Sequence, residues 1–300
     1  MMLADALASG RFVVTAELGP PVEPDAELVR QSARALVGVV DAANVTDNQA
    51  ATVKLSPLAC SAWMLEEGLE PILQLTTRDR NVMALQSDLL AAWALGVGTV
   101  LVLSGDPLKV GPYESIASRV GDVDSVGLAR LIAQMNAGQL AAGETLLTPT
   151  GFLIASAANP LVDTLEKLEP KLDAGVRCLQ TNIVYDVERF AEWFAPMVEA
   201  GVAERAAVLV GVTPPRSSRM LQYMHDRIPG IEVDDATFAR MRGLEGSEAE
   251  AAGIEIAVEV IRGVRALPGV AGVHLMAPGW ANEAVPRVVK AAALDVTAAG

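Results

Sequence analysis

The sequence predicts a single (β/α)8 barrel, an α/β fold in which eight parallel strands alternate with helices. Eight apolar runs of strand length, each ended by turn residues, alternate along the 300-residue chain with segments of helical periodicity. Such alternation implies parallel strands joined by helical crossovers, and eight of these units close naturally into a barrel. An open, doubly wound sheet is the structural alternative.

Each predicted element follows from a local pattern. The apolar runs cover residues 11–17, 40–46, 71–76, 98–104, 151–158, 176–184, 206–212 and 270–277. Helical periodicity covers 24–38, 56–67, 79–94, 123–137, 161–173, 187–200, 216–226, a two-helix passage at 234–264, and 282–294. Ser56-Pro57 and Asp124-Ser125 are typical helix starts, and helix ends are indicated by Gly68, Gly96, Gly138, Gly175 and Gly201.

Composition supports the same fold class and limits the partners. Hydrophobic residues make up 51% of the chain but aromatics only 4%, so the core must consist mainly of Ala, Val, Leu and Ile. The length suits one barrel, and no low-complexity linker divides the chain, so we expect one domain over residues 1–300. A net charge of −14 gives no reason to expect a nucleic acid or an anionic membrane as partner.

The cysteines and the N-terminus indicate a cytoplasmic protein. Cys60 and Cys178 lie in apolar surroundings without CxxC spacing, as buried free thiols of a reducing compartment do. The N-terminus lacks the basic start of a signal peptide, and the longest apolar stretch, 89–103, is shorter than the roughly 20 residues that span a bilayer. The only histidines, His225 and His274, predict no metal site.

Polar side chains follow several of the predicted strands. In a barrel, functional groups lie at the C-terminal ends of the strands, so these side chains should surround one shared mouth. Glu17 ends the first strand and Asp106 follows the fourth, and we expect them to be the deepest carboxylates of that mouth. The segment from Pro107 to Asp122, rich in Pro, Gly and Ser, indicates a lid or a substrate-contacting loop.

Glu17 is the strongest candidate for proton transfer. At the end of an apolar strand, desolvation should raise the pKa of its carboxyl group and make it a proton donor near neutral pH. The alternative is a structural carboxylate paired with an arginine inside the barrel. Asp106, taken alone, is better explained as a turn-forming residue before Pro107.

Two further strand ends carry amides. Gln180 closes a mostly apolar run, and its side chain can both donate and accept hydrogen bonds, as recognition of a heterocyclic ring requires. The alternative is a buried layer residue of the barrel interior. Asp47 and Asn48, after the second strand, could equally cap a helix.

In their order along the chain, these strand ends resemble the methylenetetrahydrofolate reductase family. The resemblance runs from residue 11 to about residue 280. Its motifs are Thr15-Ala16-Glu17-Leu18-Gly19-Pro20-Pro21, Asn44-Val45-Thr46-Asp47-Asn48, Leu75-Thr76-Thr77-Arg78-Asp79-Arg80-Asn81, Leu103-Ser104-Gly105-Asp106-Pro107, Asp122-Val123-Asp124-Ser125, Ala157-Ala158-Asn159-Pro160, Lys171-Leu172-Asp173-Ala174-Gly175, Gln180-Thr181-Asn182 and Tyr185-Asp186.

The resemblance implies an oxidoreductase of one-carbon metabolism. Members of the family reduce 5,10-methylenetetrahydrofolate to 5-methyltetrahydrofolate with electrons from NADH or NADPH, usually relayed by FAD. By the family pattern, Glu17 would be the general acid that opens the imidazolidine ring to an iminium. Asp106 would contact the pterin and tune the flavin, and Gln180 would hold the pterin.

The resemblance also assigns cofactor contacts, which are Thr46, Asn48, Thr76, Gly105, Asn159 and Lys171. Three positions differ from familiar flavin-binding members. Ser104 stands where they often carry Arg, Gln74 stands in place of a His, and Pro170 replaces one residue of a basic pair. Because charge-assisted contacts to phosphate are strong, these replacements predict weaker binding of FAD.

Two other functions remain open at this point. A pterin-dependent methyltransferase on the same barrel would transfer a methyl group without net consumption of reduced nicotinamide. A folate-binding subunit of a larger electron-transfer complex would bind folate but turn over only with its partner protein. Whether the chain works with a partner subunit or as a homo-oligomer is left open as well.

Overall fold

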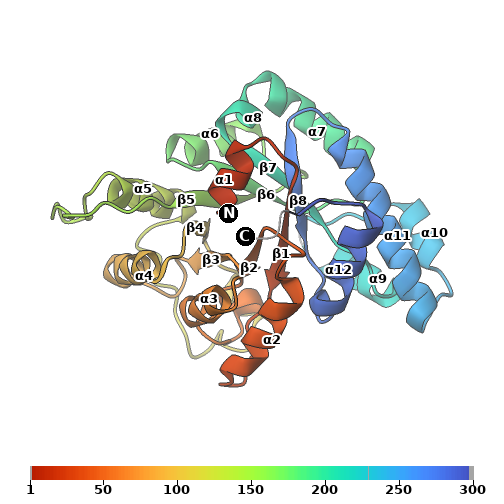
Figure 1. The fold of residues 1–300 in the computed structure, drawn as a ribbon, viewed down its shortest axis with the longest axis horizontal. Coiled ribbons are helices and arrows are strands. Elements are labelled where there is room, and N and C mark those ends of the chain that lie inside the picture. The colour runs from red at the N-terminus through yellow and green to blue at the C-terminus, as the bar shows by residue number, and fades with distance from the viewer. Residues whose placement is uncertain (1, 229, 297–300) are drawn as a thin grey trace.

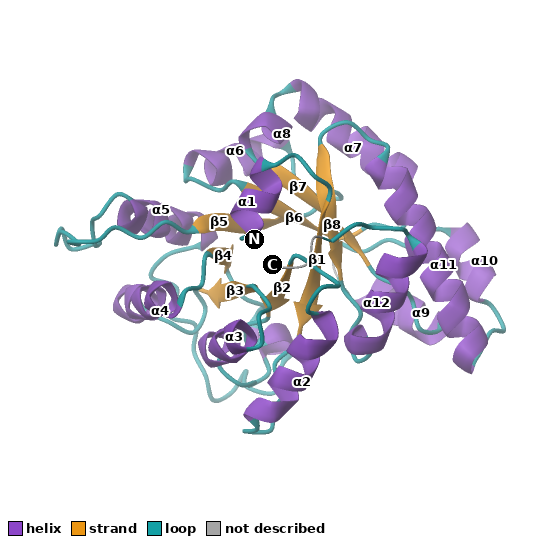
Figure 2. Ribbon diagram, viewed as in Figure 1, coloured by secondary structure: helices purple, strands orange, loops and turns teal. Residues whose placement is uncertain are grey.

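In a computed structural model that describes residues 2–228 and 230–296, eight parallel strands form one closed barrel in sequence order. Helices surround the barrel on the outside (Figures 1 and 2). The predicted fold is therefore confirmed, and the open sheet is excluded. The strands are β1 (Val13–Leu18), β2 (Ala42–Val45), β3 (Pro71–Thr76), β4 (Thr99–Leu103), β5 (Leu153–Ala158), β6 (Cys178–Ile183), β7 (Ala207–Val212) and β8 (Val270–Leu275).

The helices follow the predicted segments. They are α1 (Leu3–Ala8), α2 (Ala26–Leu36), α3 (Pro57–Glu66), α4 (Val82–Leu95), α5 (Ser125–Asn136), α6 (Leu165–Asp173), α7 (Val187–Glu199), α8 (Val202–Arg205), α9 (Ser218–Arg227), α10 (Asp235–Met241), α11 (Gly246–Arg265) and α12 (Ala281–Ala291). Short 3-10 turns η1 (Gln49–Ala51) and η2 (Leu108–Val110) follow β2 and β4. Helices α1 and α8 were not predicted, because they are too short to show a helical period.

Local chemistry sets the helix boundaries as expected. The Asp124 side chain accepts a hydrogen bond of 2.7 Å from the Gly127 amide at the start of α5, and Pro57 is the first residue of α3. The five glycines predicted to end helices all have positive φ angles, for example +95° at Gly96. Glycine adopts this conformation without the strain that a side chain would cause.

The main core lies between the outer face of the barrel and the helices, and Leu, Val and Ala dominate it. Both cysteines are buried free thiols, as predicted. Burial raises the pKa of Cys60 to about 11, so its thiol stays protonated at neutral pH. No helix in the described part of the chain is long and apolar enough to cross a membrane.

Helix α1 closes the N-terminal end of the barrel (Figure 1). Its residues Leu3 and Ala6 are buried against a cluster of apolar strand residues that includes Val13 and Ile72. The Glu70 carboxylate accepts a 2.6 Å hydrogen bond from the Leu3 amide. Burial raises the pKa of Glu70 to about 7. The N-terminal end of the barrel, which we call its lower end, is therefore filled by side chains.

Strand alternation then changes the interior from apolar to polar. Every second residue of a strand points to the same face, so Val13, Thr15 and Glu17 of β1 follow one another up the barrel interior. Val13 belongs to the apolar cluster beside α1, the Thr15 hydroxyl contacts His274, and Glu17 lines a cavity at the upper end. The functional candidates thus lie above a closed apolar layer.

At Gly272, strand β8 lies so close to β1 that a side chain has no room. A methyl group on Gly272 would come within 2.1 Å of the Val13 carbonyl oxygen on β1. We expect Gly272→Ala to lower the free energy of unfolding by about 1–3 kcal/mol, measured by urea denaturation. Gly19→Ala is the control, because an added carbon there has no atom within 4 Å. Equal effects of the two substitutions would contradict the prediction.

Candidate active site

A cavity of about 790 Å³ opens at the C-terminal ends of the strands. Strand residues supply most of its polar lining, and α9 with the segment after it supplies an apolar wall. The polar side chains include Glu17, Asn44, Asp47, Gln49, Gln74, Thr76, Asp106, Gln180, Thr181, Asn182 and His274. The apolar wall includes Met220, Tyr223, Met224, Ile228 and Ile231. The predicted shared mouth is therefore present.

Glu17 lies in this cavity without a cationic partner. In the strand register, Glu17 of β1 lies opposite Asn44 of β2. Burial raises the pKa of Glu17 to about 7, although a hydrogen bond with the Gln49 side chain acts in the opposite direction. No arginine or lysine within residues 2–228 and 230–296 forms an ion pair with Glu17. This carboxyl group can therefore hold and release a proton near neutral pH.

Gln180 forms a reciprocal amide pair with Asn44 across the barrel. Asn44 Nδ2 donates to Gln180 Oε1 at 2.6 Å, and Gln180 Nε2 donates to Asn44 Oδ1 at 3.1 Å. Both side chains are buried and line the cavity. Each amide has a second N–H and a second lone pair, so the pair can still donate to and accept from a ligand.

Asp47 connects β2 to β3 rather than capping a helix. Its carboxylate accepts from the Thr76 amide at 2.8 Å, from the Thr76 hydroxyl at 2.9 Å and from Arg80 at 2.7 Å. Arg80 also bonds to Asp88 at 2.8 Å. The Asp47 charge is thus neutralised at the floor of the mouth, which leaves Glu17 as the acid without an ion-pair partner there.

Asp106 differs from its predicted position. It is exposed at the rim, not one of the deepest carboxylates, because the chain leaves β4 at Leu103 and turns outward through Gly105. Its Oδ2 accepts a 2.6 Å hydrogen bond from the Ala50 amide in η1. Asp106 therefore joins the loop after β4 to the loop after β2.

The predicted cofactor contacts fall into two groups. Thr76 and Gly105 line the cavity. The other four lie outside the cavity lining, and each makes a hydrogen bond within the protein. They are Thr46, Asn48, Asn159 and Lys171. Their roles toward a cofactor stay predictions.

His274 is a site residue that the sequence did not reveal. It lines the cavity from β8, and its Nδ1 lies 2.9 Å from the Thr15 hydroxyl oxygen. Burial lowers the pKa of His274 to about 3, so the imidazole is neutral over the physiological range. Its inward position follows only from the strand register, in which His274 lies opposite Thr15.

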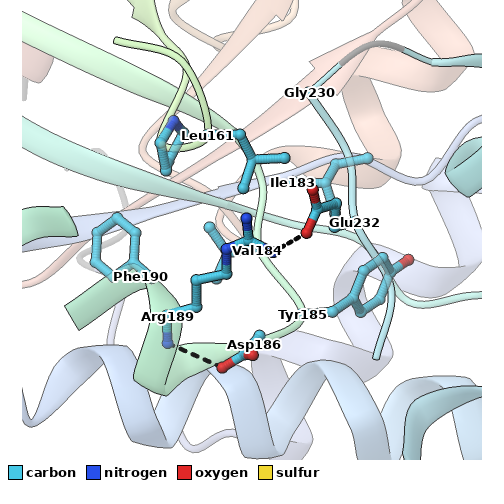
Figure 3. A pocket seen from close by; sticks show the side chains of 10 residues that line it. Leu161, Ile183, Val184, Tyr185, Asp186, Arg189, Phe190, Gly230 and Glu232 are labelled. Carbon is cyan, nitrogen blue, oxygen red and sulfur yellow. Dashed lines mark hydrogen bonds and ion pairs between the residues drawn. The ribbon is translucent and has the colours of Figure 1, made fainter. Parts of the chain in front are cut away.

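A second pocket of about 30 Å³ lies beside the mouth (Figure 3). Arg189 forms an ion pair with Glu232, and its amide donates to Asp186 at 2.9 Å. The ion pair fastens the segment after α9 to the start of α7, and the Asp186 bond caps α7 itself. Ile183 lines both this pocket and the main cavity, so the apolar wall of the mouth is anchored to β6.

The sequence model of the methylenetetrahydrofolate reductase family matches residues 2–292. The chain belongs to the methylenetetrahydrofolate reductase family. The match covers all eight strands and every polar residue of the cavity lining named above. No curated protein sequence matches this family member significantly.

One solved structure supports the fold of this methylenetetrahydrofolate reductase family member. An uncharacterized protein from Clostridium thermocellum that binds two copies of 5-methyl-5,6,7,8-tetrahydrofolic acid is 12% identical, with a TM-score of 0.71 over 97% of this chain and 98% of that one. Oxaloacetate acetylhydrolase in complex with 3,3-difluorooxalacetate is 11% identical and reaches a TM-score of only 0.48 over 91% and 78% of the two chains. That likeness supports neither fold nor function.

The buried His274 predicts how stability of this family member depends on pH. The unfolded chain binds a proton at His274 below pH 6.5, whereas the folded chain does so only near pH 3. The contribution of this group is therefore complete above pH 6.5 and is lost as pH falls toward 3. We expect His274→Asn to flatten the decline of unfolding free energy in that window by up to about 1.4 kcal/mol per pH unit. Urea denaturation at several pH values measures it, and identical slopes would contradict the prediction.

Proposed function

We propose that this chain reduces 5,10-methylenetetrahydrofolate to 5-methyltetrahydrofolate with NADH or NADPH. One observation carries the proposal: Glu17, with a pKa of about 7 and no cationic partner among the described residues, lies in the same cavity as the Asn44–Gln180 amide pair. Family membership supports a folate-related function. The structural neighbour from Clostridium thermocellum binds 5-methyltetrahydrofolate, the product of the proposed reaction.

Glu17 supplies the proton that this reaction needs. The carboxyl group protonates the imidazolidine nitrogen that leaves, and the ring C–N bond breaks to give an iminium on the other nitrogen. Hydride from the reduced nicotinamide then adds to the iminium carbon, which becomes the methyl group, and the oxidised nicotinamide departs. A donor whose pKa lies near the working pH is effective as a general acid.

The amide pair provides a surface for the pterin. The pyrimidinone edge of a pterin carries both donors and acceptors, and the spare N–H groups and lone pairs of Asn44 and Gln180 complement it. Their mutual hydrogen bonds fix the orientation of both amides before substrate arrives. Direct contact of Asp106 with the pterin, which the family pattern implies, stays a prediction.

The cationic residues of the family motifs do not fit the diphosphate of FAD. Arg78 is paired with Asp79, Arg80 with Asp47 and Asp88, and Lys171 lies 3.6 Å from Asp163 while donating to the Ala157 carbonyl oxygen. A diphosphate would have to displace these carboxylates. We therefore assign no step to a flavin.

Glu17→Gln tests the proposed acid. The amide keeps the shape of the side chain but cannot donate the proton, so we expect turnover to fall about 10²- to 10⁴-fold. The dissociation constant for 5-methyltetrahydrofolate should change only a few-fold. Activity of the unmodified protein should fall as pH rises through about 7, because Glu17 then loses its proton. Oxidation of reduced nicotinamide, followed by absorbance, gives both results.

Other outcomes would replace the proposal. Methyl transfer without net nicotinamide consumption would identify a methyltransferase. Turnover only after addition of a partner protein would identify a folate-binding subunit. Parallel loss of folate binding and activity in Glu17→Gln would give Glu17 a structural role.

An absorbance spectrum of the purified protein tests the flavin. From the paired cations, we expect no flavin bands to remain after FAD is added and the unbound excess is removed. Hydride would then come directly from the nicotinamide or through a partner subunit. Retained bands would contradict this expectation and establish the usual relay.

A further inference from the structure

The loop after β2 adopts a strained backbone. Asn48, Ala50 and Ala51 have φ angles of +47°, +54° and +49°, in the left-handed region that favours glycine, although none of them is glycine. Such residues cost free energy and persist only where surrounding contacts hold them, often beside functional sites. The contacts that hold this loop therefore indicate what its conformation is for.

The Arg78 guanidinium provides several of these contacts. Its Nη2 donates to the Asn48 carbonyl oxygen at 3.3 Å, and its Nη1 donates to the Asp106 carbonyl oxygen at 3.0 Å. Its Nε and Nη2 also donate to the Asp79 carboxylate, both at 2.7 Å. The side chain is only 4% exposed. One planar group thus ties together the ends of β2, β3 and β4.

Asp79 and Asp106 complete the arrangement, which we call the Arg78 clasp (Arg78, Asp79, Asn48 and Asp106). Asn48 Nδ2 donates to Asp79 Oδ2 at 3.3 Å, and the Ala50 amide donates to Asp106 Oδ2 at 2.6 Å. Arg78 also holds the pKa of Asp79 below its usual range, which keeps that carboxylate charged.

Two glycines allow the loops to approach this closely. A methyl group on Gly111 would lie 2.2 Å from the Ala51 carbonyl oxygen, so the loop after β4 contacts the loop after β2 backbone to backbone. A methyl group on Gly105 would lie 2.9 Å from Arg78 Cβ. The positions of the two loops are therefore coupled.

The strained loop carries Gln49 to the proposed acid. Gln49 lies between Asn48 and Ala50 and lines the same cavity as Glu17, where its side chain lowers the pKa of the Glu17 carboxyl group. Arg78 itself is not part of the cavity lining. Any effect of Arg78 on the reaction must then pass through the loop.

We propose that Arg78 is a positioning residue, whose guanidinium holds the left-handed loop after β2 so that Gln49 stays against Glu17 and Asp106 stays at the rim. This inference rests on the proposed function and adds to it the residue that positions Gln49 relative to Glu17. Arg78, which lies outside the cavity lining, thereby sets the positions of Gln49 and Asp106, which lie in it.

The other charged groups near Glu17 do not provide the same control. Asp47, from β2, is paired with Arg80 of the loop after β3. His274, from β8, is neutral, and Asp106 of the loop after β4 is bonded to the Ala50 amide. Gln49 is the group that the loop conformation brings to Glu17 or removes from it.

Arg78→Lys tests the proposal, because lysine keeps the charge but cannot make the forked contacts of a guanidinium. We expect amide hydrogen exchange of the segment 46–54 to accelerate at least about 10-fold. Turnover should fall about 10- to 100-fold, as misplacement of a reacting group by about 1 Å does. The alkaline limb of the pH–rate profile should move to higher pH, since Glu17 loses a hydrogen bond that lowers its pKa.

Arg11→Lys is the matched control. Arg11 makes a similar forked ion pair with Asp41, at the opposite end of the barrel from the mouth. This substitution should lower stability without changing exchange in segment 46–54 or the pH–rate profile. Equal changes in both variants would overturn the positioning role.

A glycine in the loop provides a rescue experiment. Ala50→Gly in the Arg78→Lys background lets the left-handed conformation form without strain, so turnover should recover at least about 3-fold. Failure to recover would overturn the claim that Arg78 acts by holding this conformation.

If Arg78→Lys does not fold, Asp79→Asn weakens the same clasp and should give the same exchange and pH changes.

The exchange measurement separates this inference from the proposed function, because it needs no substrate. If the unmodified protein does not reduce 5,10-methylenetetrahydrofolate, the proposed function fails while exchange still decides whether Arg78 holds the loop. If Arg78→Lys loses activity with unchanged exchange in segment 46–54, the proposed function survives and the positioning role is overturned.

Discussion

Closure of eight parallel strands fixes which side chains face the interior, and the rest of the structure depends on that constraint. On β1, two steps of two residues lead from Val13 in the apolar layer to Glu17 in the cavity. Because the period of a strand is two, a slip of one residue would turn this entire set outward. The amide pair between Asn44 and Gln180 forms only if both β2 and β6 keep the register that turns these side chains inward.

The carboxylates around the mouth differ in whether a cation lies beside them. Asp47 and Asp79 each have an arginine partner, so their charges are compensated where they lie. Glu17 has none in the part of the chain that the structure describes, and burial rather than repulsion by another carboxylate raises its pKa. A neutral His274 beside Thr15 adds no charge to this environment. The electrostatics therefore separate one proton donor from several structural carboxylates.

Sequence patterns predicted the features of the fold that are local. All eight strands, the long helices and the glycines that end them follow from periodicity and turn chemistry, and Glu17 follows from its place at a strand end. The partner of Gln180 could not be predicted, because Asn44 lies 136 residues away and only barrel closure brings them together. The rim position of Asp106 and the left-handed loop depend on backbone angles that residue type did not indicate.

Helix α1 closes the barrel at the end opposite the cavity. Because Leu3 and Ala6 fill the N-terminal end of the barrel, a ligand that reaches Glu17 enters from the side of the C-terminal strand ends. A barrel closed at one end thus makes the cavity a blind one, in which entry and departure share one side, and this property originates in the six residues of α1.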